Sequence, residues 1–135
     1  MLAITLKITA PIFLIVGGMH LALGIQAEVL FGAKVSLEVL SDPVVDSQSR
    51  FYAVAFTVYG FLLFLCATNL EKYQTALRTL LWVFFAAGCA RLVSIVTPGL
   101  PSEFVLTLLA SELLLPPACI LWLNRTLAHT KLALL

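Results

Sequence analysis

Charge is scarce in this chain. Charged residues make up 11% of the 135 amino acids, whereas 61% are hydrophobic and the mean hydropathy is +1.07. So few charges cannot cover the surface of an ordinary water-soluble domain. We therefore expect a lipid bilayer to be the solvent for most of the chain.

Several chemical signatures are also missing. The formal net charge is only +1, and no cluster of Lys and Arg alternates with aromatic residues, which argues against a nucleic-acid partner. Cys66, Cys89 and Cys119 lie in separate apolar runs, without C-x-x-C or His-Cys spacing. We interpret them as small buried hydrophobic residues and expect no metal and no cofactor.

Four long apolar runs are present instead, and they predict four spans at about 8–30, 51–70, 76–96 and 104–124. The third must include Arg91 and the fourth Glu112, because the uncharged stretches alone are too short to cross a bilayer. The first run exceeds the core of a signal peptide, so we expect it to be retained. The sequence predicts an all-α membrane protein, a single domain over 1–135 forming a four-transmembrane-helix up-down bundle.

The connections between the runs differ in character. Residues 71–74 form a tight polar turn, and 97–102 form a Pro/Gly hairpin loop whose Ser102 and Glu103 can cap the fourth helix. The first connection, 32–49, alternates apolar and polar residues, which predicts an interfacial flap because an open strand cannot lie in lipid. Asp46 or Ser47 would then start the second helix.

Basic residues near the span ends predict the orientation. Most of them fall on one side of the predicted membrane: Lys7, Lys72, Arg78, Arg125 and Lys131. The positive-inside rule then places both termini in the cytoplasm and the first loop outside.

The charges inside the spans are the strongest functional signal. A charged side chain near the bilayer centre costs a few kcal/mol on insertion scales, so it persists when paired, hydrated or used. At about 1.5 Å per residue, Arg91 lies roughly 8 Å and Glu112 roughly 12 Å from the outer ends of their helices. We predict that the two are in direct or one-water contact, while Arg50 and Asp46 lie at the mouth of the bundle.

Helical phase places Gly17, His20, Gly24 and Glu28 on one stripe of the first span, with His20 near the middle of the bilayer. The glycines either permit close helix packing or leave room for a ligand. Small residues also flank Arg91. On the fourth span the 116–117 Pro-Pro pair predicts a kink one turn after Glu112.

Each candidate residue has a structural alternative. Arg91 and Glu112 are either a purely structural ion pair or a pair that also lines a site, since Arg50 and His20 compete for the same carboxylate. His20 is a hydrogen-bonded core residue, a ligand contact or a proton carrier. Arg50 either snorkels to the interface or anchors a ligand, and Asp46 either caps a helix or contributes to the mouth. The tyrosine that best suits an inward hydroxyl is Tyr59.

Three segments carry a family resemblance: 46–52 with 59–60, then 84–94, then 112–117 with Trp122. Together they resemble a bacterial family of four-span proteins known as domain of unknown function four-three-four-five. The resemblance covers nearly the whole chain and includes Arg50, Arg91 and Glu112. Ala53 and Cys89 stand where that family tends to have glycine. The family resemblance implies a four-span fold in a bacterial cytoplasmic membrane and no particular activity.

We favour a non-catalytic binding or transport-accessory role, in which a pocket in the outer half of the bundle takes a lipid or other amphiphile with a polar or anionic head. Arg50 and Arg91 would face the head group and Glu112 would balance their charge, with His20, Asp46 and Tyr59 as further lining residues. One alternative is a membrane-embedded enzyme that uses Glu112 and His20 for acid–base chemistry on a lipophilic substrate. The other is a structural subunit, including a homo-oligomer assembled through the glycine face.

Overall fold

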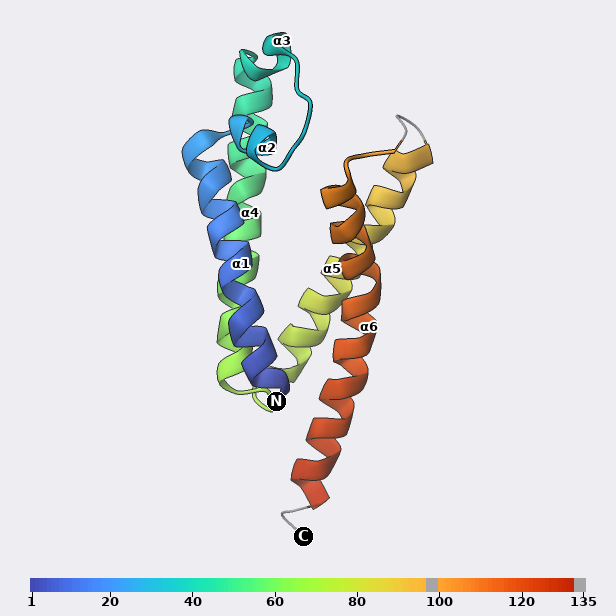
Figure 1. Cartoon of the computed structure of the whole chain (residues 1–135). Helices are drawn as coiled ribbons and strands as arrows, with labels where there is room; N and C mark the ends of the chain where they lie inside the picture. The colour runs from blue at the N-terminus through green and yellow to red at the C-terminus, as the bar shows by residue number, and fades with distance from the viewer. Residues whose placement is uncertain (97–99, 133–135) are drawn as a thin grey trace. The chain divides into compact units, whose positions relative to one another are not determined.

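The computed structural model of the chain describes residues 1–96 and 100–132, and for residues 129–132 it describes the backbone alone. Part of the predicted 97–102 loop and the Lys131 side chain therefore lie outside the described residues. The helices, in chain order, are α1 (Leu2–Leu23), α2 (Gln26–Leu30), α3 (Leu37–Leu40), α4 (Pro43–Thr68), α5 (Gln74–Val96) and α6 (Glu103–Leu132) (Figure 1).

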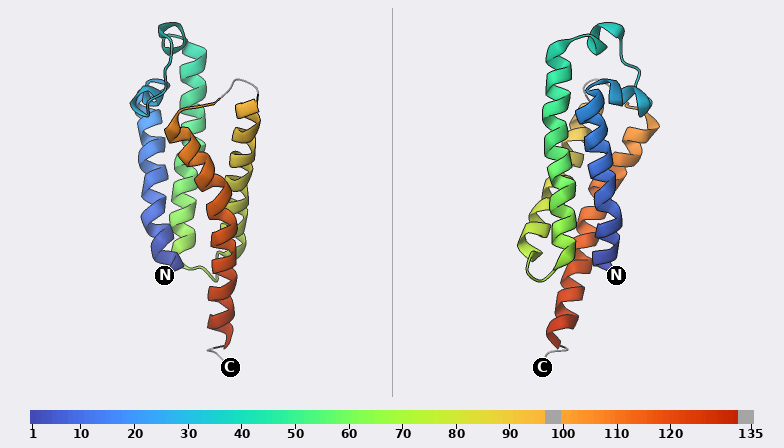
Figure 2. Two further views of the ribbon diagram at one scale, coloured as in Figure 1. Left: turned by 45° about the vertical axis from the view of Figure 1, so that its right-hand side comes forward. Right: turned by 90° about the vertical axis from the view of Figure 1, so that its left-hand side faces the viewer.

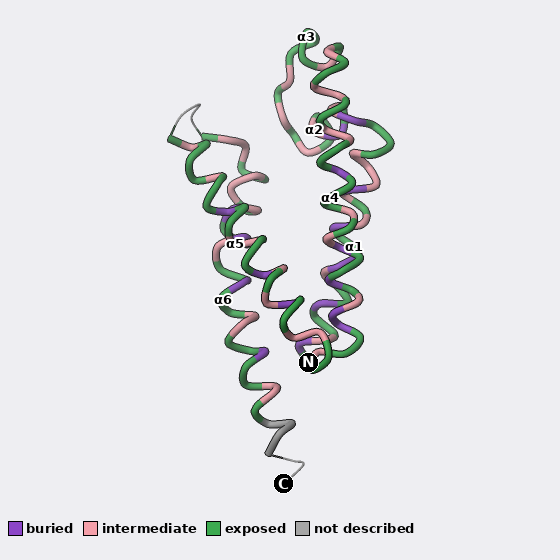
Figure 3. Tube along the Cα trace, turned by 180° about the vertical axis from the view of Figure 1, so that it is seen from behind, coloured by how far each residue is buried: buried purple, intermediate pink, exposed green. Residues whose placement is uncertain are grey.

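Four of these helices, α1, α4, α5 and α6, are long and apolar enough to cross a membrane. The described residues contain no β-strand. Figure 3 shows exposed residues along all four long helices. Many of them are large and apolar, for example Ile8, Phe61, Trp82 and Leu114. Since water would not tolerate so much exposed apolar surface, lipid must cover it. The predicted fold class, an all-α membrane protein with four long helices, is confirmed.

The chain divides into two compact units. One comprises Leu6–Leu65, and the other comprises Met1–Thr5 with Cys66–Leu135. The first contains most of α1 and α4 with the two short helices between them, and the second contains the α5–α6 hairpin.

In the Leu6–Leu65 unit, α1 and α4 run side by side in every view (Figures 1 and 2). Two glycines allow the close approach. A Cβ atom on Gly17 would lie 2.2 Å from Thr57 Oγ1 and 2.9 Å from its backbone nitrogen, and one on Gly60 would lie 2.7 Å from Phe13 Cβ. The Phe13 ring packs against Phe56 and Tyr59, each with ring centroids 4.9 Å apart. Gly17 therefore serves helix packing.

Gly24 ends α1. Its φ of +60° is left-handed, which favours glycine, and its N–H donates to His20 O at 2.8 Å. The first span was predicted to continue to residue 30, whereas the chain turns at Gly24 and re-forms a helix as α2. His20 consequently lies in the last turn of α1 rather than at mid-span.

The first connection contains two short helices. Ser36 accepts a hydrogen bond from Val39 N and caps α3. Asp42 Oδ1 accepts from Val44 N at 2.7 Å and Val45 N at 3.4 Å, and Pro43 occupies the first position of α4. The second long helix thus begins at Pro43, before the predicted Asp46 or Ser47, and Asp46 lies inside its first turn.

In the other unit, α5 and α6 form an antiparallel pair (Figure 1). Helix α6 begins at Glu103, directly after Ser102, as predicted. Its two internal prolines, Pro116 and Pro117, lack the N–H groups that would bond the carbonyls of Glu112 and Leu113. Figure 2 shows α6 changing direction along its length, in agreement with the expected kink.

Candidate functional site

Arg91 on α5 and Glu112 on α6 form a direct ion pair. Arg91 Nε donates to Glu112 Oε1 at 2.9 Å and lies 2.8 Å from Oε2. The contact with Oε2 lacks hydrogen-bond geometry, and this buried oxygen has no donor among the described residues. The prediction that the two residues are in contact is confirmed.

Gly88 explains why the pair forms at this level of the hairpin. A Cβ atom there would lie 2.9 Å from Glu112 Cβ and 3.0 Å from Leu113 Cδ2. The missing side chain lets α6 pack directly on α5, one turn before Arg91. Glu112 is therefore 4% exposed, and its carboxylate lies within reach of the guanidinium.

This contact does not use all the hydrogen-bond donors of Arg91. Its side chain is 39% exposed, and within the described part of the chain only Nε has an acceptor. A guanidinium carries five N–H donors, of which four belong to Nη1 and Nη2. A two-pronged set of donors thus remains for an acceptor from outside the protein.

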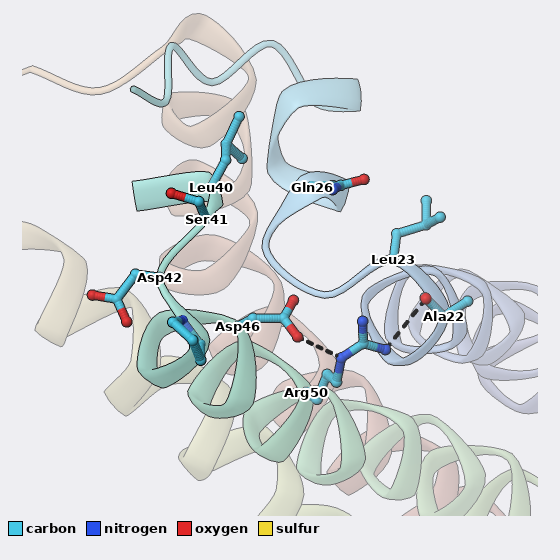
Figure 4. A pocket seen from close by; sticks show the side chains of 9 residues that line it. Ala22, Leu23, Gln26, Leu40, Ser41, Asp42, Asp46 and Arg50 are labelled. Carbon is cyan, nitrogen blue, oxygen red and sulfur yellow. Dashed lines mark hydrogen bonds and ion pairs between the residues drawn. The ribbon is translucent and has the colours of Figure 1, made fainter. Parts of the chain in front are cut away.

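Arg50 and Asp46 join the end of α1 to the first turns of α4 (Figure 4). Arg50 Nε donates to Asp46 Oδ2 at 2.8 Å. Arg50 Nη1 donates to Leu21 O, and to Ala22 O at 3.2 Å. Asp46 Oδ1 accepts from Ile25 N at 3.2 Å. The pair therefore satisfies carbonyls that the last turn of a helix leaves free, as well as one N–H beyond the turn.

Gly24 makes room for this arrangement. A Cβ atom at Gly24 would lie 1.6 Å from Asp46 Oδ1 and 3.2 Å from Arg50 Nη2. Any side chain there would displace the carboxylate. The glycine thus has two roles, ending α1 and admitting Asp46.

A pocket of about 370 Å³ adjoins this ion pair. Most of its polar lining comes from the start of α4 and the residues before it (Figure 4). The lining residues are Ala22, Leu23, Gln26, Leu40, Ser41, Asp42, Pro43, Asp46 and Arg50.

His20 is held by contacts within its own unit. Its Nδ1 lies 2.9 Å from Val16 O and its Nε2 lies 3.3 Å from Glu28 Oε1. The imidazole also stacks on Phe31, with ring centroids 5.7 Å apart and planes 9° apart. An acid–base role for His20 would require one of these contacts to break.

The six predicted site residues fall into two groups. His20, Asp46, Arg50 and Tyr59 belong to the Leu6–Leu65 unit, whereas Arg91 and Glu112 belong to the α5–α6 unit. Within their own unit, Arg50 is paired with Asp46 and His20 with Glu28. The expectation that Arg50 and His20 compete for Glu112 stays a prediction. That four ionisable groups line one pocket stays a prediction.

Sequence reasoning overlooked Asp42 and undervalued Glu28. The Asp42-Pro43 dipeptide is a typical helix start, with an acidic cap followed by proline at the first helical position. The four-residue spacing of Asp46 and Arg50 also indicates an ion pair on one helical face. The sequence placed Glu28 and His20 on one face of a continuous helix, whereas their contact forms across the turn at Gly24.

Comparison with known proteins adds a family and no activity. No curated protein and no solved structure matches the chain. The family described as "Domain of unknown function (DUF4345)" matches residues 1–123. This match spans all four long helices up to Leu123, and the chain therefore belongs to the DUF4345 family.

Proposed function

We propose that this protein binds an amphiphile with an anionic or strongly polar head group, in a non-catalytic or transport-accessory role. The observation that supports the proposal is the incomplete coordination of Arg91. Its Nε is held by Glu112, while Nη1 and Nη2 have no acceptor within the described residues.

The cost of this arrangement in a membrane favours a bound partner. Arg91 lies inside a candidate span, where hydrogen-bond donors without acceptors are expensive. Glu112 offsets the positive charge but leaves the terminal nitrogens without partners. A carboxylate or phosphate accepts two parallel bonds from such a fork, with N···O distances of about 2.7–2.9 Å. Apolar residues exposed on the same helix, such as Leu92, provide surface for a hydrocarbon tail.

Glu112 also gives the site selectivity for ligands that do not displace it. It is buried where α6 packs closely on Gly88, so the carboxylate cannot easily move away. A ligand would add to the exposed side of the guanidinium while Nε stays on the carboxylate. The arginine is thereby oriented before the ligand arrives, which lowers the entropy lost on binding.

The location that accompanies this role is the bacterial cytoplasmic membrane, with both termini in the cytoplasm. The proposal rests on the positive-inside distribution of Lys and Arg. Assembly into a homo-oligomer is compatible with the role and is not required by it.

Thermal stability with matched amphiphiles tests the function. The purified chain in neutral detergent is titrated with dodecyl phosphate and, separately, with dodecanol, which has the same tail without the charge. Dodecyl phosphate should raise the unfolding temperature in a saturable way, because a ligand that binds only the folded state stabilises it. Dodecanol should have little effect.

Three variants identify the residue responsible. Arg91→Gln should weaken dodecyl phosphate binding about tenfold or more, the scale of a charge-assisted bidentate contact. Arg91→Lys should recover only part of the affinity, because a lysine offers a point charge and no fork. Arg78→Gln, on the same helix but in an earlier turn, is the control and should bind normally. Equal weakening by Arg78→Gln, or unchanged binding in Arg91→Gln, would reject the proposal.

A further inference from the structure

The pocket between α1 and α4 is a second candidate site, independent of Arg91. It lies wholly within the Leu6–Leu65 unit and begins where α4 enters its candidate span. Its volume of about 370 Å³ is in the range of small-molecule sites. Exposed Leu37 and Val44, on α3 and at the start of α4, place apolar side chains in the same segment. This combination of polar pocket and exposed apolar residues is typical of the head-group region of a bilayer.

The charges of the lining are unequal. Two carboxylates, Asp42 and Asp46, face one guanidinium, Arg50. Asp46 and Arg50 neutralise each other through their 2.8 Å contact. The charge of Asp42 is left over, because Asp42 has no cationic partner among the described residues. A net charge of one negative unit favours a cationic group in the pocket.

The available acceptors specify the kind of cation. Asp42 Oδ1 caps α4, which leaves Oδ2 without a donor in the described part of the chain. Ser41 donates its hydroxyl proton to Glu38 O, so its oxygen lone pairs can accept. Figure 4 shows the Gln26 amide pointing away from the Asp42 carboxylate, so Gln26 does not add to this group of acceptors. A primary ammonium has N–H donors that suit Asp42 and Ser41, whereas quaternary ammonium groups are recognised by aromatic side chains, which the lining does not contain.

The opposite end of the pocket suits an anion. Figure 4 shows Asp42 on one side, Arg50 on the other and Asp46 between them. Arg50 directs Nε to Asp46 and Nη1 to the end of α1, and Nη2 has no acceptor among the described residues. The pocket therefore has an acidic end and a donor end, as a zwitterionic ligand requires.

We propose that this pocket binds a phosphoethanolamine-type head group of an aminophospholipid, with the primary ammonium at Asp42 and the phosphate at Arg50 Nη2. The proposal does not depend on the anion site at Arg91. It assigns a binding role to Asp42 and Ser41, in addition to their structural roles in the first connection.

A series of lipids that differ only in N–H donors tests the proposal without any mutation. Short-chain phosphatidylethanolamine, its monomethyl and dimethyl derivatives, and phosphatidylcholine are offered to the intact chain in neutral detergent. Native mass spectrometry measures the bound fraction of each. Affinity should fall stepwise along the series, with phosphatidylethanolamine about fivefold to tenfold tighter than phosphatidylcholine, the scale of one charge-assisted hydrogen bond partly screened by water. Equal affinities across the series would overturn the proposal.

Asp42→Asn then tests the acidic end. Asparagine is an equally good helix cap, so the start of α4 is preserved while the charge is removed. The preference for phosphatidylethanolamine should disappear in this variant. The control is Glu38→Gln, which removes an equal charge from the exposed face of α3 outside the pocket lining. If Glu38→Gln abolishes the preference as strongly as Asp42→Asn, the preference comes from general electrostatic attraction and the proposed binding in the pocket is rejected.

Two further experiments distinguish a lipid from a free amine as the ligand, and this pocket from the Arg91 site. Binding of soluble phosphoethanolamine with the same dependence on Asp42 would assign the pocket to a free amine and support ammonium recognition, whereas binding of the lipid alone assigns it to the membrane. Arg91→Gln should keep the phosphatidylethanolamine preference. Loss of the preference in Arg91→Gln would overturn the independence of the two sites.

Discussion

A single unsatisfied oxygen distinguishes the Arg91–Glu112 pair from an ordinary structural salt bridge. Glu112 is almost fully buried, yet only Oε1 receives a hydrogen bond within the described residues. Burying a carboxylate with spare acceptor capacity is costly, and the cost grows if the arginine is removed. The energetics of the pair are therefore asymmetric.

Leucine substitutions should expose this coupling. Glu112→Leu and Arg91→Leu should each destabilise the chain, and the double variant should lose less stability than the sum of the two. The expected coupling is on the order of 0.5–3 kcal/mol. Of the two single variants, Arg91→Leu should lose more stability, because it leaves the buried carboxylate without a partner. Reversible unfolding in detergent measures it. Strictly additive effects would show that the two side chains are energetically independent.

Neighbouring glycines on α1 offer a matched test of close packing. A Cβ atom at Gly17 would meet the Thr57 backbone, whereas one at Gly18 would have nothing within 4 Å. Gly17→Ala should therefore destabilise the chain by about 1–3 kcal/mol through overpacking. Gly18→Ala should be neutral or stabilising by roughly 0.5–1 kcal/mol, since alanine favours helix. Unfolding temperatures compare the two, and similar values would argue against a tight α1–α4 contact.

At the scale of elements, α2 is held against the end of α1 by a contact between His20 and Glu28. Val16 O can only accept, so the 2.9 Å contact places a proton on His20 Nδ1. The other ring nitrogen, Nε2, lies 3.3 Å from Glu28 Oε1 and so links the last turn of α1 to α2.

Removal of the Glu28 carboxylate should accordingly loosen α2. In Glu28→Ala, His20 loses its partner across the turn, and amide exchange in α2 should accelerate relative to exchange in α3. Glu28→Gln is the matched control, because the glutamine amide can still form a hydrogen bond with Nε2 and should keep α2 in place. An unchanged exchange ratio in Glu28→Ala would contradict a role for this contact in holding α2.

At the scale of the whole molecule, the orientation in the membrane is a prediction from charge. A cysteine placed at Ser41 or Ser47, in a chain lacking Cys66, Cys89 and Cys119, should react with an impermeant thiol reagent added outside the cell. Cysteines at Lys72 should react only after the membrane is opened. The reverse pattern would invert the predicted topology.

Much of the fold was predictable because it depends on hydropathy and on unpaired charge. Four long apolar runs require four long helices, and two opposite charges at similar depths require each other. The contacts of Arg50 with Asp46 and of His20 with Glu28 were not predicted, because they depend on a backbone break at Gly24 within a run that hydropathy alone shows as continuous. The charged residues around that break pair with near neighbours. Estimates of how deep each residue lies in the membrane could not reveal these local pairs.

The bonds from Arg50 to the end of α1 have a consequence for biogenesis. The ribosome makes Leu21 and Ala22 well before Arg50, so a newly inserted α1 has no guanidinium to satisfy these carbonyls. Water or polar groups of the insertion machinery must donate hydrogen bonds to these carbonyls until the first turns of α4 emerge. The first helix can therefore enter the membrane alone but cannot complete its structure alone, and α1 and α4 should mature together during synthesis.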